Sequence, residues 1–127
     1  MDAQAIVQQA ETAYASQDLN LVEALFHPDV EVYWNGKKSM QGRDAVMEFE
    51  TRNFASWHDF RIHKTLRAAT GNTIAVEWEV SFISNQSGDK VEVLGAEFWT
   101  IEDGLLKIWQ TYTTNYVTKR EDLTAAP

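Results

Sequence analysis

The first third of the chain carries apolar residues at helical spacing. After Asp2, a candidate N-cap, apolar side chains recur every three or four residues as far as Ser16, which predicts a first amphipathic helix. Asp18 can cap a second, shorter helix whose apolar residues share one face. We expect this helix to end near Phe26, because the ring of Pro28 disfavours helical backbone at the residue before it.

A third helix is expected after an extended stretch and two turn signals. Residues 30–34 are typical of extended chain, and residues 35–36 and Gly42 are typical of turns. From about Arg43 to Trp57, apolar side chains recur along one stripe, which predicts a helix.

From Phe60 onward the apolar period changes from 3.6 to 2, which marks a change from helices to strands. Between Ile74 and Phe82 every even-numbered residue is apolar and the odd-numbered residues are mixed, so we expect the even face to lie inward. Turn signals at 85–90 and 102–104 separate this strand from strands at 91–101 and 105–116. The pattern predicts an antiparallel meander.

A run of helices followed by a run of strands is typical of the α+β class. A long, strongly twisted sheet around three short helices makes a cone with an open mouth, and a cone encloses a cavity. The chain has 127 residues and no repeat or Pro/Gly-rich linker, which fits a single domain over 1–127. We expect its tail to be loosely ordered from about residue 117.

Three short sequence motifs carry a resemblance that spans nearly the whole chain. They are Phe26-His27-Pro28-Asp29-Val30 leading to Tyr33-Trp34, Gly42-Arg43-Asp44-Ala45-Val46 with Phe49, and Asp103-Gly104-Leu105-Leu106 followed by Trp109 and Tyr112. With the order of elements, they resemble the nuclear transport factor 2-like superfamily, in particular its SnoaL-like (polyketide cyclase-like) and ketosteroid isomerase-like branch. The resemblance implies a cone-shaped α+β barrel, in which three N-terminal helices pack on a strongly curved, mostly antiparallel sheet around a deep apolar pocket, and commonly a dimer. It does not imply one reaction, since similar members include isomerases, cyclases, epoxide hydrolases, dehydratases and proteins without chemistry.

The alternation and the resemblance agree on the side chains that face the cavity. These candidate ligand-binding residues are Trp34, Trp57, Trp78, Val80, Phe82, Trp99, Trp109, Thr111 and Thr113. Several indoles around one space suit the wall of a site for a flat or apolar ligand, whose polar atoms the threonines would orient. The alternative is a packed aromatic core with no ligand.

Glu97 is the first candidate catalytic residue, because it places a carboxylate on the same face as Trp99. Without a cationic partner, desolvation raises the pKa of such a carboxyl and makes it a proton donor or a general base. In ketosteroid isomerase-like members this position matches the acid that hydrogen-bonds the substrate oxyanion. The structural alternative is a carboxylate that bonds a Trp N–H, a backbone group or a threonine.

Two reactions known in similar members are disfavoured by the residues of this chain. Where the isomerases keep their catalytic base this chain has Trp34, and where they keep a hydrogen-bonding Tyr it has Ala10. Epoxide hydrolase-like members have an Asp two residues after a Trp of the final strand, and Thr111 stands there. A hydroxyl does not replace that carboxylate as a base.

His58 is the second candidate catalytic residue, since an imidazole near the pocket mouth titrates near neutral pH and suits a proton carrier for Glu97. His58 and His63 do not have a known metal-ligand spacing, so we expect no metal and no cofactor. By their period, Glu77 and Glu79 point away from the cavity into solvent.

The charge and composition of the chain limit the kinds of molecule that it is expected to bind. The formal charge of −8 disfavours nucleic acid and anionic membranes, and the absence of cysteine excludes disulfides and thiolate chemistry. Neither a leader nor a membrane-spanning segment is apparent, so we expect a cytoplasmic protein. The outward face of the last two strands is too apolar for water, which predicts a homodimer through the residues Leu94, Ala96, Phe98, Ile108, Gln110 and Tyr112.

Three functions remain open from the sequence. The first is a cofactor-independent enzyme that transfers a proton on a small hydrophobic ligand bearing a carbonyl or hydroxyl group, with Glu97 and His58 as its acid and base. The second is a non-catalytic binding protein of the same fold. The third is a dimeric interaction protein whose sheet matters more than its cavity. No motif names the ligand.

Overall fold

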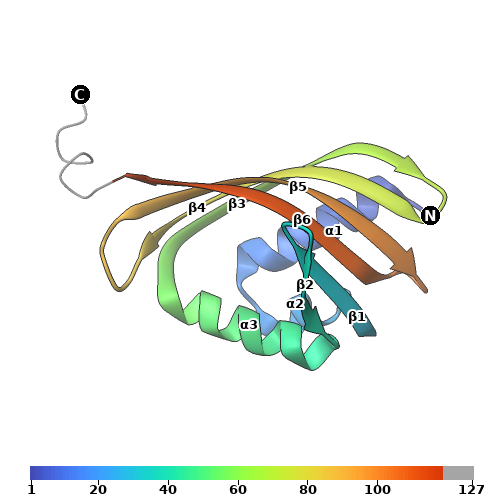
Figure 1. Ribbon diagram of the computed structural model, residues 1–127, viewed down its shortest axis with the longest axis horizontal. Helices are drawn as coiled ribbons and strands as arrows, with labels where there is room; N and C mark the ends of the chain where they lie inside the picture. Colours follow the sequence, from blue (N-terminus) through green and yellow to red (C-terminus); the bar gives the residue numbers. More distant parts are fainter. Residues whose placement is uncertain (119–127) are drawn as a thin grey trace.

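The computed structural model of this protein describes residues 1–118, which form three helices and one six-stranded sheet (Figure 1). The elements are α1 (Ala3–Ser16), α2 (Leu19–Glu23), β1 (Phe26–Trp34), β2 (Lys37–Gln41), α3 (Arg43–Ser56), β3 (Trp57–Thr70), β4 (Thr73–Ser84), β5 (Lys90–Glu102) and β6 (Leu105–Thr118). The predicted α+β class is confirmed. None of these helices is long and apolar enough to cross a membrane.

The first two helices begin where the capping residues predict. The Asp2 side chain accepts a hydrogen bond from the Ala5 amide at 3.0 Å, and Asp18 accepts one from the Asn20 amide at 2.9 Å. Between the helices, Gln17 adopts a left-handed conformation with φ 54°, which ends α1.

The prediction that the second helix runs to Phe26 is wrong. Helix α2 ends at Glu23, and Phe26 begins β1, with Pro28 inside the strand. The register of β1 against β6 shifts between Phe26 and Glu31, so the missing amide of Pro28 falls in an irregular part of the ladder. The Leu25 carbonyl accepts the Leu106 amide at 2.9 Å, which joins the chain to the sheet just before β1.

Strand β2 was missed by the hydrophobic pattern. It is an edge strand of mostly exposed polar residues, so it shows no apolar alternation. Asn35 and Gly36 have φ values of 51° and 86°, and this turn joins β1 to β2 as an antiparallel hairpin.

The sheet has the strand order β2-β1-β6-β5-β4-β3 and is curved and unclosed, so the structure is a cone rather than a closed barrel (Figure 1). Strands β1 and β6 are parallel and all other pairs are antiparallel, which confirms the predicted meander of β4 to β6 and adds β3 to it. Figure 1 shows the three helices on one side of this sheet. There they cover its concave face, which holds the core.

Helix α3 and β3 meet without a loop, because α3 ends at Ser56 and β3 begins at Trp57, earlier than the predicted change of period at Phe60. Asp59 adopts φ 52°, and the register of β3 against β4 shifts between His58 and Arg61. This bulge hides the alternation at the start of the strand. At the other end of the chain, residues 117–118 lie in β6, and the rest of the predicted loose tail lies outside the described residues.

The core lies between the helices and the even-numbered face of β4, as the alternation predicted. Ile74 and Val76 are buried, whereas Glu77 and Glu79 are exposed. Other buried apolar side chains from the helices and β1 complete this core, namely Val7, Ala10, Ala13, Val22, Leu25, Phe26, Val30, Val32 and Val46. Beyond Val76 on the same face of β4, Trp78, Val80 and Phe82 line a cavity.

Candidate functional site

A cavity of about 270 Å³ lies between α1, α3 and the concave face of the sheet. Its wall is mostly aromatic and aliphatic. The side chains with polar groups that line it are Tyr14, Lys64, Glu50, Asn53, Glu97, Asn115 and the indoles. A small apolar site with a few polar groups is the usual form of a small-molecule binding site.

Eight of the residues proposed from the sequence line this cavity. They are Trp34, Trp57, Trp78, Val80, Phe82, Glu97, Trp99 and Trp109. The structure brings them together because residues 78, 80 and 82 of β4 share a face with residues 97 and 99 of β5 and residue 109 of β6.

The other three proposed residues do not line the cavity. His58 follows the cavity-lining Trp57 in β3 and is exposed, and its Nδ1 lies 2.6 Å from Oδ1 of Asn85. Thr111 is fully buried opposite Glu97, and the Thr113 amide donates to Oδ1 of Asn35 at 3.0 Å. The expected approach of His58 to Glu97 is therefore not met, since each side chain has other partners.

The aromatic wall is made of two groups of packed rings. Trp57 lies 4.4 Å from Phe82 and 5.2 Å from Phe60, measured between ring centroids. In the second group, Trp109 lies 6.1 Å from Trp34 and 5.8 Å from Phe26. Stacked, tilted and edge contacts of this kind hold each ring in place, so the wall is preformed.

Trp78 lies directly against the sheet over Gly95. The two residues face each other in the register of β4 and β5, and a Cβ on Gly95 would lie 2.5 Å from Cε2 of the indole. Only glycine leaves room for the ring there. The glycine before Glu97 therefore shapes the cavity floor, a role that the sequence did not indicate.

Glu97 is buried and holds three donors. Its Oε1 accepts from Nζ of Lys64 at 3.2 Å and from Nε1 of Trp99 at 3.1 Å, and its Oε2 accepts from Nε1 of Trp109 at 2.8 Å. Glu97 therefore has a cationic partner, so the condition that the sequence analysis set, a carboxyl without one, is not met. These contacts match the non-catalytic interpretation of Glu97 given above, in which its carboxylate accepts a hydrogen bond from a Trp N–H.

Lys64 was missed by the sequence reasoning. It faces Trp78 in the register of β3 and β4, so it shares the inward face with Ile62 and Leu66. Its side chain is only 7% exposed, and its Nζ lies 5.3 Å from the ring of Trp99, 5.6 Å from that of Trp78 and 5.8 Å from that of Tyr14. These ring faces attract the ammonium group.

Glu50, on α3, is the second buried carboxyl of the cavity and was also missed. It is 3% exposed and accepts a hydrogen bond from Nδ2 of Asn53 at 2.9 Å. Burial raises its pKa, although the contacts with Tyr14 and Asn53 and the charge of Lys64 oppose the shift. A signal was available, because Glu50 lies one turn after Val46 on the stripe that predicted the helix.

Tyr14 lies beside Glu50 at the end of α1. Its hydroxyl is buried, and burial followed by the charge of Glu50 raises its pKa well above the usual value. The phenol therefore stays protonated. Glu50, Lys64, Glu97 and Tyr14 form the polar end of the cavity, which we call the acid-lysine cluster.

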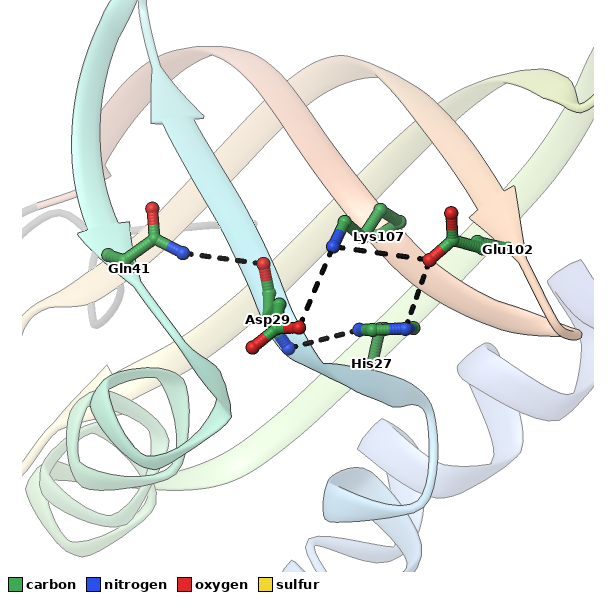
Figure 2. Close-up of polar contacts among 5 residues, drawn as sticks. All are labelled: His27, Asp29, Gln41, Glu102 and Lys107. Atoms are coloured by element: carbon green, nitrogen blue, oxygen red, sulfur yellow. Dashed lines mark hydrogen bonds and ion pairs between the residues drawn. The ribbon is translucent and has the colours of Figure 1, made fainter.

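A separate group of side chains with metal-ligating atoms lies at the start of β1, beside the end of β5 and outside the cavity. His27, Glu102 and Asp103 lie near one another, and Figure 2 shows the ring of His27 between the Asp29 amide and Glu102. Nδ1 of His27 accepts the Asp29 amide at 3.0 Å, so the proton of the neutral ring is on Nε2, which faces Glu102 at 3.0 Å. That nitrogen has no free lone pair for a metal, so the contacts fit a structural link between β1 and the turn after β5.

Comparisons with known proteins agree with this fold. The profile of the family described as SnoaL-like domain matches residues 7–110. A hypothetical protein with a ketosteroid isomerase-like fold from Catenulispora acidiphila, solved in complex with trimethylamine, is 17% identical with a TM-score of 0.73, over 94% of this chain and 89% of that one. No curated protein sequence matches the chain.

Two further solved structures are similar. A putative polyketide cyclase from Xanthomonas campestris pv. campestris is 21% identical with a TM-score of 0.75, over 87% of this chain and 88% of that one. An epoxide hydrolase/cyclase-like enzyme of pyran ring formation in the polyether salinomycin is 17% identical with a TM-score of 0.79, over 91% and 95%. At these identities the likeness shows the fold alone.

Proposed function

The chain belongs to the SnoaL-like domain family, and from that premise we propose that it binds a small, largely apolar molecule in its cavity and transfers a proton to or from it with Glu50. The ligand class is the one expected from the sequence, a hydrophobic molecule that bears a carbonyl or hydroxyl group. The catalytic carboxyl differs, because Glu50 replaces Glu97 in this role.

The observation that carries the proposal is the environment of Glu50. Its carboxyl lines an apolar cavity, and burial raises its pKa. An acid whose pKa moves toward neutral pH is a stronger base when ionised and still a proton donor when protonated. Glu97 is less suited to this role, since three donors already occupy its two oxygens.

Lys64 has a complementary role in this proposal. When Glu50 removes a proton next to a carbonyl group, negative charge develops on the carbonyl oxygen. The ammonium group of Lys64 lines the same cavity and is held by Glu97, so it can stabilise that charge without reorganising. The proton then returns from Glu50 to the product, and no cofactor enters the reaction.

Some proteins of the same fold are named as enzymes, which supports an enzymatic function for this chain but names no reaction. One neighbour is named as a putative polyketide cyclase, and another as an epoxide hydrolase/cyclase-like enzyme of pyran ring formation. The neighbour that holds trimethylamine supports a second candidate, non-catalytic binding of a small molecule. The saturated hydrogen bonds of Glu97 favour the same candidate, because a fully bonded carboxylate needs no substrate to satisfy it.

Hydrogen exchange at the α-carbon of 2-indanone in deuterated buffer tests the proposal. We expect the wild-type protein to accelerate exchange and Glu50→Gln to lose the acceleration. Glu48→Gln is the matched control, since Glu48 is an exposed carboxyl on the same helix. Binding of 2-indanone without acceleration would support the binding protein instead, and absence of binding would overturn the proposed function.

A further inference from the structure

We propose that the cavity also takes a small organic ammonium ion, held between the carboxylate of Glu50 and the aromatic wall. The inference rests on the proposed function in one respect, that this cavity admits a ligand. It goes beyond that function because the ligand is a cation and acts as the counter-ion of Glu50.

The charges of the acid-lysine cluster leave one carboxyl without a counter-ion. Lys64 lies 3.2 Å from Glu97, and both side chains are buried. Among residues 1–118, no lysine or arginine nitrogen lies within ion-pair distance of Glu50, whose one well-formed hydrogen bond comes from Asn53. A buried carboxylate without a counter-ion is costly, so a cationic ligand would stabilise its ionised form.

The aromatic wall suits an ammonium group. The protein already holds one there, since Nζ of Lys64 lies 5.3 to 5.8 Å from the centroids of three rings. Further rings line the rest of the cavity, including those of Trp34, Trp57, Phe60 and Trp109. Ring faces attract cations and do not attract anions, so the wall discriminates by charge as well as by shape.

The positive charge of Lys64 does not cancel the preference of the cavity for a cation. Its charge is opposed by Glu97 within 3.2 Å, so with Glu50 ionised the cluster carries two carboxylates and one ammonium. A second ammonium brings the cluster to neutrality. The net charge of −8 for the whole chain also raises the local concentration of cations around it.

Binding should exchange a ligand cation for a proton. The groups that face Glu50 are Tyr14 from α1, Asn53 from its own helix, Lys64 from β3 and Glu97 from β5. When an ammonium ion enters, the Glu50 carboxylic acid releases its proton to solvent and the carboxylate pairs with the ligand. Affinity therefore rises with pH until Glu50 is already ionised in the free protein.

Calorimetric titration with three probes of one ring size tests the inference, namely benzylammonium chloride, benzyl alcohol and sodium benzoate. We expect the wild-type protein to bind benzylammonium about ten-fold or more tightly than the other two. Glu50→Gln should lose this difference while benzyl alcohol binds as before, and Glu48→Gln should keep it. Titrations in two buffers of different ionisation enthalpy should show proton release.

Each outcome separates this inference from the proposed function. The ammonium site would be overturned if the wild-type protein bound benzyl alcohol as tightly as benzylammonium. It would also be overturned if Glu50→Gln kept the preference for benzylammonium. The exchange of 2-indanone would then decide the proposed function by itself. If Glu50→Gln does not fold, the three probes on the wild-type protein still decide. If no probe binds, the ammonium site is overturned, and binding and exchange of 2-indanone still decide the proposed function.

Discussion

The ammonium group of Lys64 lies 3.2 Å from the carboxylate of Glu97, and the two side chains are 7% and 2% exposed. Two further residues of the cavity wall meet this pair, because the indoles of Trp99 and Trp109 also donate to Glu97. The pair therefore connects β3, β5 and β6 beneath the cavity.

Removing one partner of this pair should destabilise the protein strongly. We expect Lys64→Met to cost about 3 to 5 kcal/mol of unfolding free energy, because it leaves Glu97 as a buried charge without its cation. Adding Glu97→Gln should recover part of the loss. Urea denaturation of the single and double variants measures this coupling. Lys38→Met is the control, since its ion pair with Glu31 lies at the protein surface, where such pairs contribute little to stability. An equal loss of stability in Lys64→Met and Lys38→Met would contradict the prediction.

A methyl group at residue 95 should displace the cavity floor. In Gly95→Ala the new Cβ overlaps the ring of Trp78, so we expect a loss of about 1 to 3 kcal/mol and weaker binding of 2-indanone. Combining it with Trp78→Phe should relieve the overlap, because the smaller ring does not reach as far. Denaturant titration and near-ultraviolet circular dichroism report the two effects. A Gly95→Ala protein with wild-type stability and spectrum would show that Trp78 does not need this glycine.

The fold could be predicted from the sequence because its signals are periodic. Helical spacing and strand alternation identified the three helices and the meander, and alternation placed the indoles of Trp78 and Trp99 on one face. Strand β2 gave no such signal, since a polar edge strand buries nothing. At Pro28 the local rule against helix was correct, but the chain enters the sheet earlier because an irregular register tolerates the missing amide.

The candidate site could be predicted only in part. Glu97 stood out because a carboxylate interrupted an apolar face. Its partner Lys64 did not, since a lysine on β3 reads as an exposed residue until the register pairs it with Trp78. Glu50 lies in a charged part of α3, where its spacing from Val46 was the available signal, and the packing of that helix over the sheet shows that its carboxyl is buried.

The raised pKa of Glu50 predicts a pH dependence of stability. Because the folded state holds the proton more tightly than the unfolded chain, the folded protein binds more protons between the two pKa values. Stability therefore falls as pH rises above the ordinary value of 4.5 and levels off once the folded pKa is passed. Glu50→Gln should lack this fall, so its stability relative to wild type should increase with pH across that window.

Urea denaturation of both proteins at a series of pH values measures this difference. Glu48→Gln should follow the wild-type curve, because its carboxyl is exposed on the same helix. A constant difference between Glu50→Gln and wild type across the window would show that folding does not perturb the carboxyl.

The outer face of the sheet should pair two copies of the chain. Leu94, Phe98 and Tyr112 are 46%, 43% and 45% exposed, and the rings of Phe98 and Tyr112 are in contact on neighbouring strands. An apolar patch of this kind is costly in water, and two copies related by a two-fold axis would cover it with the same residues.

We therefore expect a homodimer in sedimentation velocity at micromolar concentration. Phe98→Glu should yield a folded monomer, because it places a charge in the middle of the patch while the cavity on the other face is untouched. Glu48→Gln, an exposed change on α3, should leave the dimer intact, and a wild-type monomer would remove the inference.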